Sequence, residues 1–169
     1  MRLDVLAALS VGSTLVLAGT VLGQPASSPA VSAPPADYGP PISNEQAKAV
    51  AAAALAEARK NNSPMAVAIV GPAGELVYFE KMDGTQLASI EIAQGKARTA
   101  LMFRRPSKVF ADHYAARDRA FTSFPEQPVA SEGGVPIVVD GKIIGSIGVS
   151  GVTAQQDAQI ARAGADAVK

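Results

Sequence analysis

The chain has 169 residues, with 15 lysines and arginines balanced by 15 aspartates and glutamates, and a single histidine. A neutral chain argues against nucleic acid or an anionic membrane surface as the main partner, because both attract proteins through clustered positive charge. The chain contains no cysteine, which excludes disulfides, thiolate catalysis, zinc–thiolate sites and covalent haem attachment through C-x-x-C-H.

The first part of the chain is typical of an export signal. Arg2 and Asp4 precede an apolar run over residues 5–22 that carries no charge, which is the layout of a secretory signal peptide. We predict a signal peptide over residues 1–23, although about 18 apolar residues would also suffice for an uncleaved membrane span. The absence of cysteine excludes a lipoprotein anchor. We therefore expect an exported protein, periplasmic or extracellular, without a stable membrane anchor after cleavage.

Residues 24–41 have a different composition. They are rich in proline, alanine and serine and nearly uncharged, so they cannot bury a core of their own. This composition predicts a disordered linker over 24–41. Residues 42–169 remain as one domain, which is long enough to bury an adequate core without covalent staples.

The domain begins with a helix–hairpin pattern. Ser43 and Gln46 have the spacing of a capping box and predict a helix that continues to Lys60, with alanines along its inner face. Residues 65–70 are apolar on both faces, which indicates a covered central strand. A glycine- and proline-containing turn follows, and residues 75–82 alternate well enough to form the paired strand.

The middle of the chain reads as helices followed by a loop. Residues 88–102 predict a second helix, and Gly95 inside it indicates a close crossing with another helix or strand, since glycine weakens helices. Ser107 is placed to cap a short helix over 108–116. Residues 120–132 show little periodicity and predict a loop on the surface.

The C-terminal part predicts a hairpin followed by a helix. Residues 135–139 and 143–149 are short apolar runs, and Asp140-Gly141 between them favours a type I′ turn. Three glycines spaced three residues apart indicate places where another segment packs tightly on the backbone, or where the chain bends: Gly145, Gly148 and Gly151. A helix is expected over 154–168. Strands joined by tight turns and flanked by helices predict an α+β fold with an antiparallel sheet covered by helices on its faces.

A succession of short motifs in the domain resembles a known family. The motifs are Asp83-Gly84, Gly95-Lys96-Ala97-Arg98-Thr99-Ala100, Gly133-Gly134-Val135-Pro136-Ile137, Asp140-Gly141, the run from Ile144 to Gly151, Gln156-Asp157 and Ile160-Ala161. This succession closely resembles the GlcG/HbpS family of haem-binding proteins, which is related to the C-terminal domain of PduO-type proteins. The resemblance implies a profilin-like fold, assembly into a homo-oligomer, and haem or a related tetrapyrrole as ligand. It also implies that exported members bind haem outside the cell.

Five residues are candidates for contacting the haem that this resemblance implies: Lys96, Thr99, Arg105, Ser107 and His113. Haem carries two propionates, which bind cations. A basic cluster lies around the end of the second helix and consists of Lys96, Arg98, Arg104, Arg105 and Lys108. The alternative is a solvated helix end whose cations face the helix dipole. The single histidine, His113, is a candidate axial ligand, and so are Met102 and Tyr114.

No histidine–carboxylate spacing typical of a metal site occurs in the sequence. The carboxylates of Glu75, Glu80 and Asp83 could bind a cation, but solubility of an edge strand is the simpler interpretation, and we assign no metal ligand.

Enzyme chemistry finds less support in the residues. Gly148 to Gly151 resembles a G-x-S-x-G motif only superficially, because its second glycine comes one residue early. We assign no catalytic residue and regard enzyme activity as uncertain. The sequence therefore predicts an exported haem-binding protein that sequesters or senses haem as a homo-oligomer. The alternatives are an enzyme or enzyme accessory acting on a small metabolite or corrinoid at the same pocket, and an oligomeric module without ligand.

Overall fold

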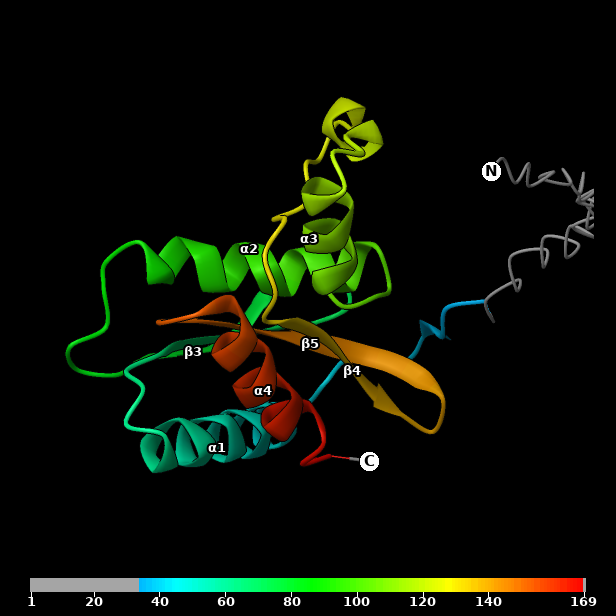
Figure 1. The fold of residues 1–169 in the computed structure, drawn as a ribbon. Helices are drawn as coiled ribbons and strands as arrows, with labels where there is room; N and C mark the ends of the chain where they lie inside the picture. The colour runs from blue at the N-terminus through cyan, green and yellow to red at the C-terminus, as the bar shows by residue number, and fades with distance from the viewer. Residues whose placement is uncertain (1–33, 169) are drawn as a thin grey trace, which may run out of the picture. The chain divides into compact units, whose positions relative to one another are not determined.

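The computed structural model describes residues 34–168, so the predicted signal peptide lies outside the described residues. In chain order the elements are β1 (Asp37–Tyr38), α1 (Asn44–Lys60), β2 (Ala66–Val70), β3 (Leu76–Lys81), α2 (Ser89–Met102), α3 (Lys108–Ala115), the 3₁₀ turn η1 (Ala120–Ser123), β4 (Gly134–Val139), β5 (Lys142–Ser150) and α4 (Ala154–Ala165) (Figure 1). Within this part of the chain, no helix is long and apolar enough to cross a membrane.

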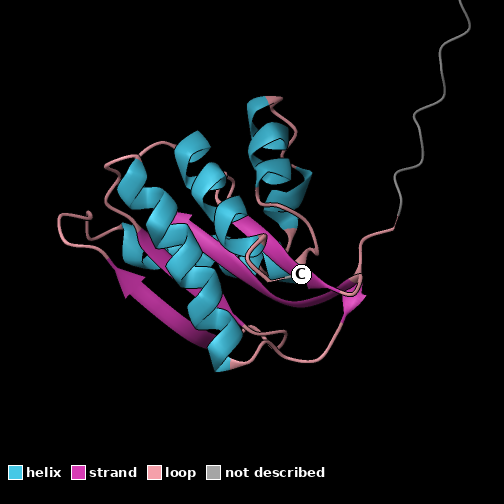
Figure 2. Cartoon of the chain, turned by 90° about the horizontal axis from the view of Figure 1, so that it is seen from below, coloured by secondary structure: helices cyan, strands magenta, loops and turns pink. Residues whose placement is uncertain are grey.

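The sheet is organised around β5, its longest strand. β2 and β4 lie antiparallel on the two sides of β5, and β3 continues the sheet beyond β2. β1 pairs with the start of β5 in parallel, at Lys142 and Ile143. Helices α1 and α4 cover one face of the sheet and α2 covers the other (Figures 1 and 2). The predicted α+β fold, with helices on both faces of a mainly antiparallel sheet, is confirmed.

Helix α1 forms as its sequence predicts. The Ser43 hydroxyl accepts a hydrogen bond from the Gln46 amide at 3.2 Å, and the Gln46 side chain accepts one from the Ser43 amide at 3.0 Å. This capping box satisfies two backbone donors that a helix start otherwise leaves unpaired. Small side chains let the inner face approach the sheet closely, and the buried residues are Ala47, Val50, Ala51, Ala54, Leu55 and Ala58.

Two of the predicted glycine and turn features are confirmed, and one is corrected. Asp140 and Gly141 both have positive φ angles, 49° and 72°, as a type I′ turn requires. A side chain at Gly148 would collide with the α2 backbone at Ala93, so α2 packs directly on β5. Gly95 does not mark a crossing with a helix or strand. A Cβ atom there would instead lie 2.8 Å from the Val129 side chain, in the segment that leads to β4.

The predicted linker ends earlier than residue 41. The Tyr38 hydroxyl donates a hydrogen bond to the Leu101 carbonyl at 2.9 Å, and Arg104 forms an ion pair with Asp37 at 3.2 Å. Ile42 is buried in the core between the sheet and helices α1 and α4. These long-range contacts pack residues 37–42 against the domain. A proline-rich composition carries no signal for such contacts, so the sequence placed this segment in the linker.

A buried ion pair joins the two helical layers. Lys96 of α2 and Asp157 of α4 are 1% and 3% exposed, and their Nζ and Oδ2 atoms are 2.7 Å apart. The Lys96 ammonium also donates to the Val149 carbonyl at 3.2 Å. Gly133 lies beside this pair with φ of 117°, and a Cβ atom there would be 2.6 Å from the same carbonyl. The pair therefore fixes α2, α4 and the end of β5 relative to the start of β4.

Removing one member of this pair should strongly destabilise the domain. Lys96→Met leaves the Asp157 carboxylate buried without its partner, and we expect a loss of about 3–5 kcal/mol in the free energy of unfolding. The double variant Lys96→Met/Asp157→Leu should lose much less, because neither charge then remains buried. Urea denaturation followed by circular dichroism measures both values.

The control for this experiment is Lys108→Met. Lys108 pairs with Asp112 at 2.6 Å, but both side chains are about half exposed, and an exposed pair contributes about 0–1 kcal/mol. If Lys96→Met destabilised the domain no more than Lys108→Met does, the buried pair would not hold the layers together.

Candidate ligand-binding site

A cleft lies at the C-terminal end of α2 and is lined by residues of the α2–α3 connection, α3 and η1. In Figure 1, α3 projects away from the sheet beyond α2. We call the cleft the aromatic pocket, and it has a volume of about 250 Å³. Its lining residues are Phe103, Arg105, Val109, Phe110, His113, Asp118, Ala120, Phe121 and Phe124. The pocket thus combines an apolar wall with an arginine, a histidine and a carboxylate.

The wall of the pocket is a connected set of phenylalanine rings. The Phe103 and Phe110 centroids are 4.7 Å apart, and Phe110 meets Phe121 edge-on at 5.8 Å. Phe124 stacks on Phe103 at 5.8 Å and remains 42% exposed. Aromatic pairs at these separations stabilise one another beyond the area they bury. The rings therefore form a firm apolar surface that is open to solvent on the side of Phe124.

His113 is held by the carboxylate of Asp118. The His113 Nδ1 and Asp118 Oδ2 atoms are 2.8 Å apart, and Asp118 Oδ1 accepts a hydrogen bond from the Ala120 amide at 3.1 Å. The amide of Ala120 and, next, the hydrogen bond with His113 lower the pKa of Asp118. An ionised carboxylate only accepts hydrogen bonds, so Nδ1 must donate. This leaves Nε2 of a neutral imidazole as an electron-pair donor, the arrangement found in metal-binding histidines.

Arg105 contributes a positive charge to the pocket. Its Nε atom donates a hydrogen bond to the Phe103 carbonyl at 2.9 Å, which ties the guanidinium to the residue that begins the aromatic wall. This bond uses one of the five N–H donors of the guanidinium. The remaining donors suit a carboxylate, which arginine binds in a planar, bidentate manner.

The other predicted ligand residues lie elsewhere and have other partners. Thr99 is buried, and its hydroxyl accepts a hydrogen bond from the Val129 amide at 2.9 Å. Ser107 is also buried and does not cap α3 as predicted. Its hydroxyl donates to the Ser131 carbonyl at 2.6 Å and accepts from the Gly134 amide at 2.8 Å. Both hydroxyls hold the segment that runs from the pocket back to β4.

The predicted basic cluster does not form as one surface. Lys96 is buried with Asp157, Arg104 pairs with Asp37, and Lys108 pairs with Asp112 and Glu132. Of the five predicted ligand residues, the structure brings Arg105 and His113 together in one pocket. Lys96, Arg104 and Lys108 are instead paired with acidic side chains, which are distant in the sequence for Lys96 and Arg104.

Sequence reasoning missed Asp118 and the aromatic wall. A signal for the wall is present, since four of the five phenylalanines in the chain line this pocket although aromatic residues make up only 5% of the sequence. Met102 and Tyr114 were the further candidates for the axial ligand. Met102 does not line the pocket. The Tyr114 ring faces the guanidinium of Arg119, whose central carbon is 5.2 Å from the ring centroid. Within residues 34–168, no three His, Asp or Glu side chains gather to hold a metal ion.

The fold and the cleft define the class of protein: an α+β domain with a helix-covered, profilin-like sheet and one aromatic pocket of mixed polarity. Residues 42–166 match a family described as haem degrading protein HbpS-like. The chain belongs to this HbpS-like family, which confirms the resemblance seen in its motifs.

Individual relatives agree with this assignment. Protein GlcG of Escherichia coli strain K12 is 42% identical over 109 residues, which are 64% of this chain and 81% of GlcG. The crystal structure of HbpS superimposes with a TM-score of 0.71 at 30% identity, covering 78% of this chain and 92% of HbpS. The crystal structure of a PduOC:heme complex gives a TM-score of 0.70 at 26% identity, covering 76% of this chain and 96% of that protein.

The lowered pKa of Asp118 gives a test of the pocket geometry. We expect its carboxyl to titrate below the ordinary value of 3.8. Because the folded-state pKa is depressed, the stability gained from these bonds is present above pH 3.8 and is lost as the pH falls through the folded-state value. Carbon-detected NMR titration of the side-chain carboxyl measures it.

His113→Ala is the matched comparison for this titration. It should raise the pKa of Asp118 only part of the way to its ordinary value, because the hydrogen bond from the Ala120 amide remains and is the larger cause. A wild-type Asp118 that titrates at or above 3.8 would show that neither bond holds the carboxylate in solution.

Proposed function

We propose that this domain binds haem in the aromatic pocket, with His113 as axial ligand and Arg105 as partner of a propionate. The observation that carries the proposal is the His113–Asp118 pair, because it leaves Nε2 of His113 without the proton in a pocket that the aromatic wall also lines. That a related structure is a PduOC:heme complex supports the choice of ligand.

The residues of the pocket fit the chemistry of haem. The porphyrin requires a flat apolar surface, its iron an electron-pair donor, and its propionates a cation. The apolar surface is supplied by Phe103, Phe110 and Phe124. His113 supplies the electron-pair donor for the iron, and Arg105 supplies the cation for a propionate. The volume of about 250 Å³ is below the roughly 300–1,000 Å³ of enclosed small-molecule sites. The pocket would therefore hold one part of the tetrapyrrole and leave the rest outside it.

Each side chain has a definite task in this proposal. Asp118 keeps the proton on Nδ1 of His113 and fixes the orientation of the ring. The phenylalanine rings provide an apolar surface for the porphyrin, and Arg105 orients the ligand by its charge. Haem, when bound, supplies an iron centre whose redox chemistry the protein tunes through this axial ligand.

The setting and assembly of the protein complete the proposal. The pattern of residues 1–23 supports export, so haem would be bound in the periplasm or outside the cell. There the protein would sequester or sense haem as a homo-oligomer. The incomplete enclosure of the ligand by one pocket is consistent with assembly, since a second molecule can cover what one leaves exposed.

An enzyme or enzyme accessory acting on a small metabolite or corrinoid at the same pocket is the second candidate. The same His113–Asp118 pair favours it, because an imidazole oriented by a carboxylate can also act as a general base. Turnover of a substrate that survives complete removal of haem would distinguish this activity from haem binding.

Haemin titration of the mature protein tests the main proposal. We expect a saturable Soret change at low micromolar protein, and His113→Ala should shift the band because the iron loses its ligand. Asp118→Asn should weaken binding about 10–100-fold, as loss of a carboxylate behind a metal-bound histidine typically does.

Lys108→Ala is the control for this titration, because Lys108 lies on the same helix but does not line the pocket. An absent Soret change in the wild type would refute haem binding. An unchanged spectrum in His113→Ala would remove His113 as axial ligand and direct attention to Met102 or Tyr114.

A further inference from the structure

A cleft on the solvent side of α2 is made of two adjoining cavities, with volumes of about 380 and 120 Å³. They adjoin because three residues line both of them: Arg98, Met102 and Glu126. We call the two cavities together the α2 cleft. The larger cavity shares no lining residue with the aromatic pocket, and the smaller one shares Phe103 alone. The larger volume is within the roughly 300–1,000 Å³ of small-molecule sites.

Helix periodicity builds the part of the cleft that belongs to α2. Gly95, Arg98 and Met102 follow one another at i, i+3 and i+7, so they lie on one face of the helix. Gly95 leaves room for the segment that returns to β4, because a Cβ atom there would lie 2.8 Å from the Val129 side chain. Residues of β1 and of the turn after β2 complete the larger cavity: Tyr38, Pro72, Ala73 and Gly74.

The larger cavity has an apolar lining that is held in place. The Tyr38 hydroxyl donates to the Leu101 carbonyl at 2.9 Å, which ties the tyrosine ring to the end of α2. Tyr38 and Met102 are each 46% exposed, so a ring and a thioether meet the solvent in this cavity. An aromatic ring and an adaptable thioether together suit the apolar group of a small ligand.

Two opposite charges line the α2 cleft, those of Arg98 and Glu126. Both residues are exposed, and in the part of the chain that the structure describes neither side chain forms an ion pair or a hydrogen bond. They do not pair with each other, although they line the same two cavities. A guanidinium binds a carboxylate through two parallel hydrogen bonds, and a carboxylate accepts hydrogen bonds from an ammonium. Both charges therefore remain available to a ligand.

The charged residues beside the cleft are already engaged. Arg104 forms an ion pair with Asp37 at 3.2 Å. The Glu75 carboxylate accepts a hydrogen bond from the Ala73 amide at 3.0 Å, within the turn after β2. Neither Arg104 nor Glu75 lines the cleft, so the charge that a ligand meets there is one cation and one anion.

We propose that the α2 cleft binds a small zwitterion, an α-amino acid with an apolar side chain. Arg98 binds its carboxylate, Glu126 binds its ammonium, and the apolar side chain lies against Tyr38 and Met102. A ligand with both charges at one end and an apolar group at the other pairs with every free group of the cleft at once. This second site goes beyond haem binding and does not depend on it, because the larger cavity is separate from the aromatic pocket.

Titration with L-phenylalanine and two analogues tests the proposal. The analogue 3-phenylpropionate keeps the carboxylate and lacks the ammonium, and 2-phenylethylamine keeps the ammonium and lacks the carboxylate. Proton–nitrogen correlation NMR of the mature protein should show saturable shifts of the Ala73, Gly74 and Met102 amides with L-phenylalanine. Each analogue should bind about tenfold more weakly or worse, because it leaves one charged residue without a partner.

Single substitutions assign the two charges. Arg98→Gln should weaken binding of L-phenylalanine and 3-phenylpropionate about tenfold or more and leave 2-phenylethylamine unchanged. Glu126→Gln should weaken binding of L-phenylalanine and 2-phenylethylamine and leave 3-phenylpropionate unchanged. Both positions are exposed, so both variants should melt like the wild type.

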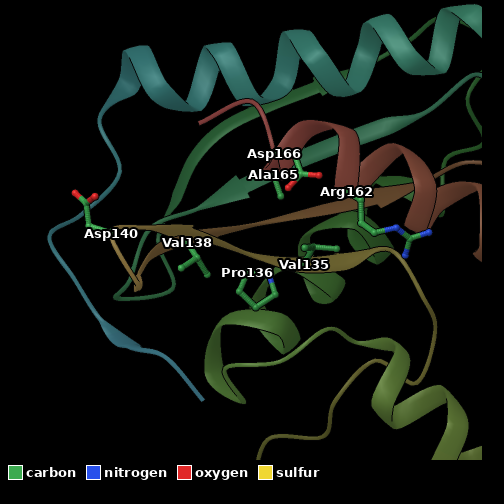
Figure 3. Close-up of a pocket in the computed structure, with 7 residues that line it drawn as sticks. All are labelled: Val135, Pro136, Val138, Asp140, Arg162, Ala165 and Asp166. Atoms are coloured by element: carbon green, nitrogen blue, oxygen red, sulfur yellow. The ribbon is translucent and has the colours of Figure 1, made fainter. Parts of the chain in front are cut away.

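Arg162→Gln is the matched control. Arg162 is also exposed, but it lines a different cavity of about 450 Å³ between β4 and the end of α4, together with Asp140 and Asp166 (Figure 3). The substitution removes the same charge as Arg98→Gln does, at a site that shares no residue with the α2 cleft. It should leave the affinity for all three compounds unchanged.

Several results would overturn the proposal. L-phenylalanine that gives no saturable shift up to about 10 mM would show that the cleft does not bind it. Equal affinity for 3-phenylpropionate and L-phenylalanine would make the cleft an anion site without selectivity for a zwitterion. Shifts confined to Phe121 and Phe124 would place the compound in the aromatic pocket. An equal loss of affinity in Arg162→Gln and Arg98→Gln would show that net charge, and not the cleft, determines binding.

Discussion

The buried ion pair between Lys96 and Asp157 is the constraint on which the rest of the domain depends. It connects helices on opposite faces of the sheet beside the point where β4 begins. Burying two charges is costly, and an apolar pair of similar volume would often be at least as stable. The pair instead fixes the position of α2 relative to α4 and β5, because the Lys96 ammonium must bond both the Asp157 carboxylate and the Val149 carbonyl. Only glycine at residue 133 leaves room for that geometry.

The position of α2 then determines where the aromatic pocket lies. Behind the pocket, the hydroxyls of Thr99 and Ser107 hold the returning segment by its backbone. Within the pocket itself, Arg105 lies on the connection between α2 and α3, and His113 lies on α3. The polar residues of this region thus divide into buried ones that fix the chain and exposed ones that can meet a ligand. Their residue types alone do not separate the two groups.

Features with a recognised local sequence signature could be predicted from the sequence, whereas contacts between distant partners, and the loop contact of Asp118 that has no such signature, could not. The capping box at Ser43 and the turn at Asp140 are set within a few residues, and both form as predicted. Lys96 looked like one member of a basic cluster because its partner is 61 residues further along the chain. Ser107 looked like a helix cap because its partners are 24 and 27 residues away. Family resemblance indicated the ligand class, whereas the carboxylate behind His113 emerged only from the fold.

The His113–Asp118 pair is made within a single short stretch, and this has an evolutionary consequence. The two residues are five positions apart on a segment that projects beyond α2, and neither belongs to the core clusters. Substitutions or insertions there can change what the pocket binds without disturbing the sheet or the buried ion pair. Ligand preference can therefore diverge among proteins that share this fold, and sequence identity across the core is a weaker guide to the ligand than these few projecting residues.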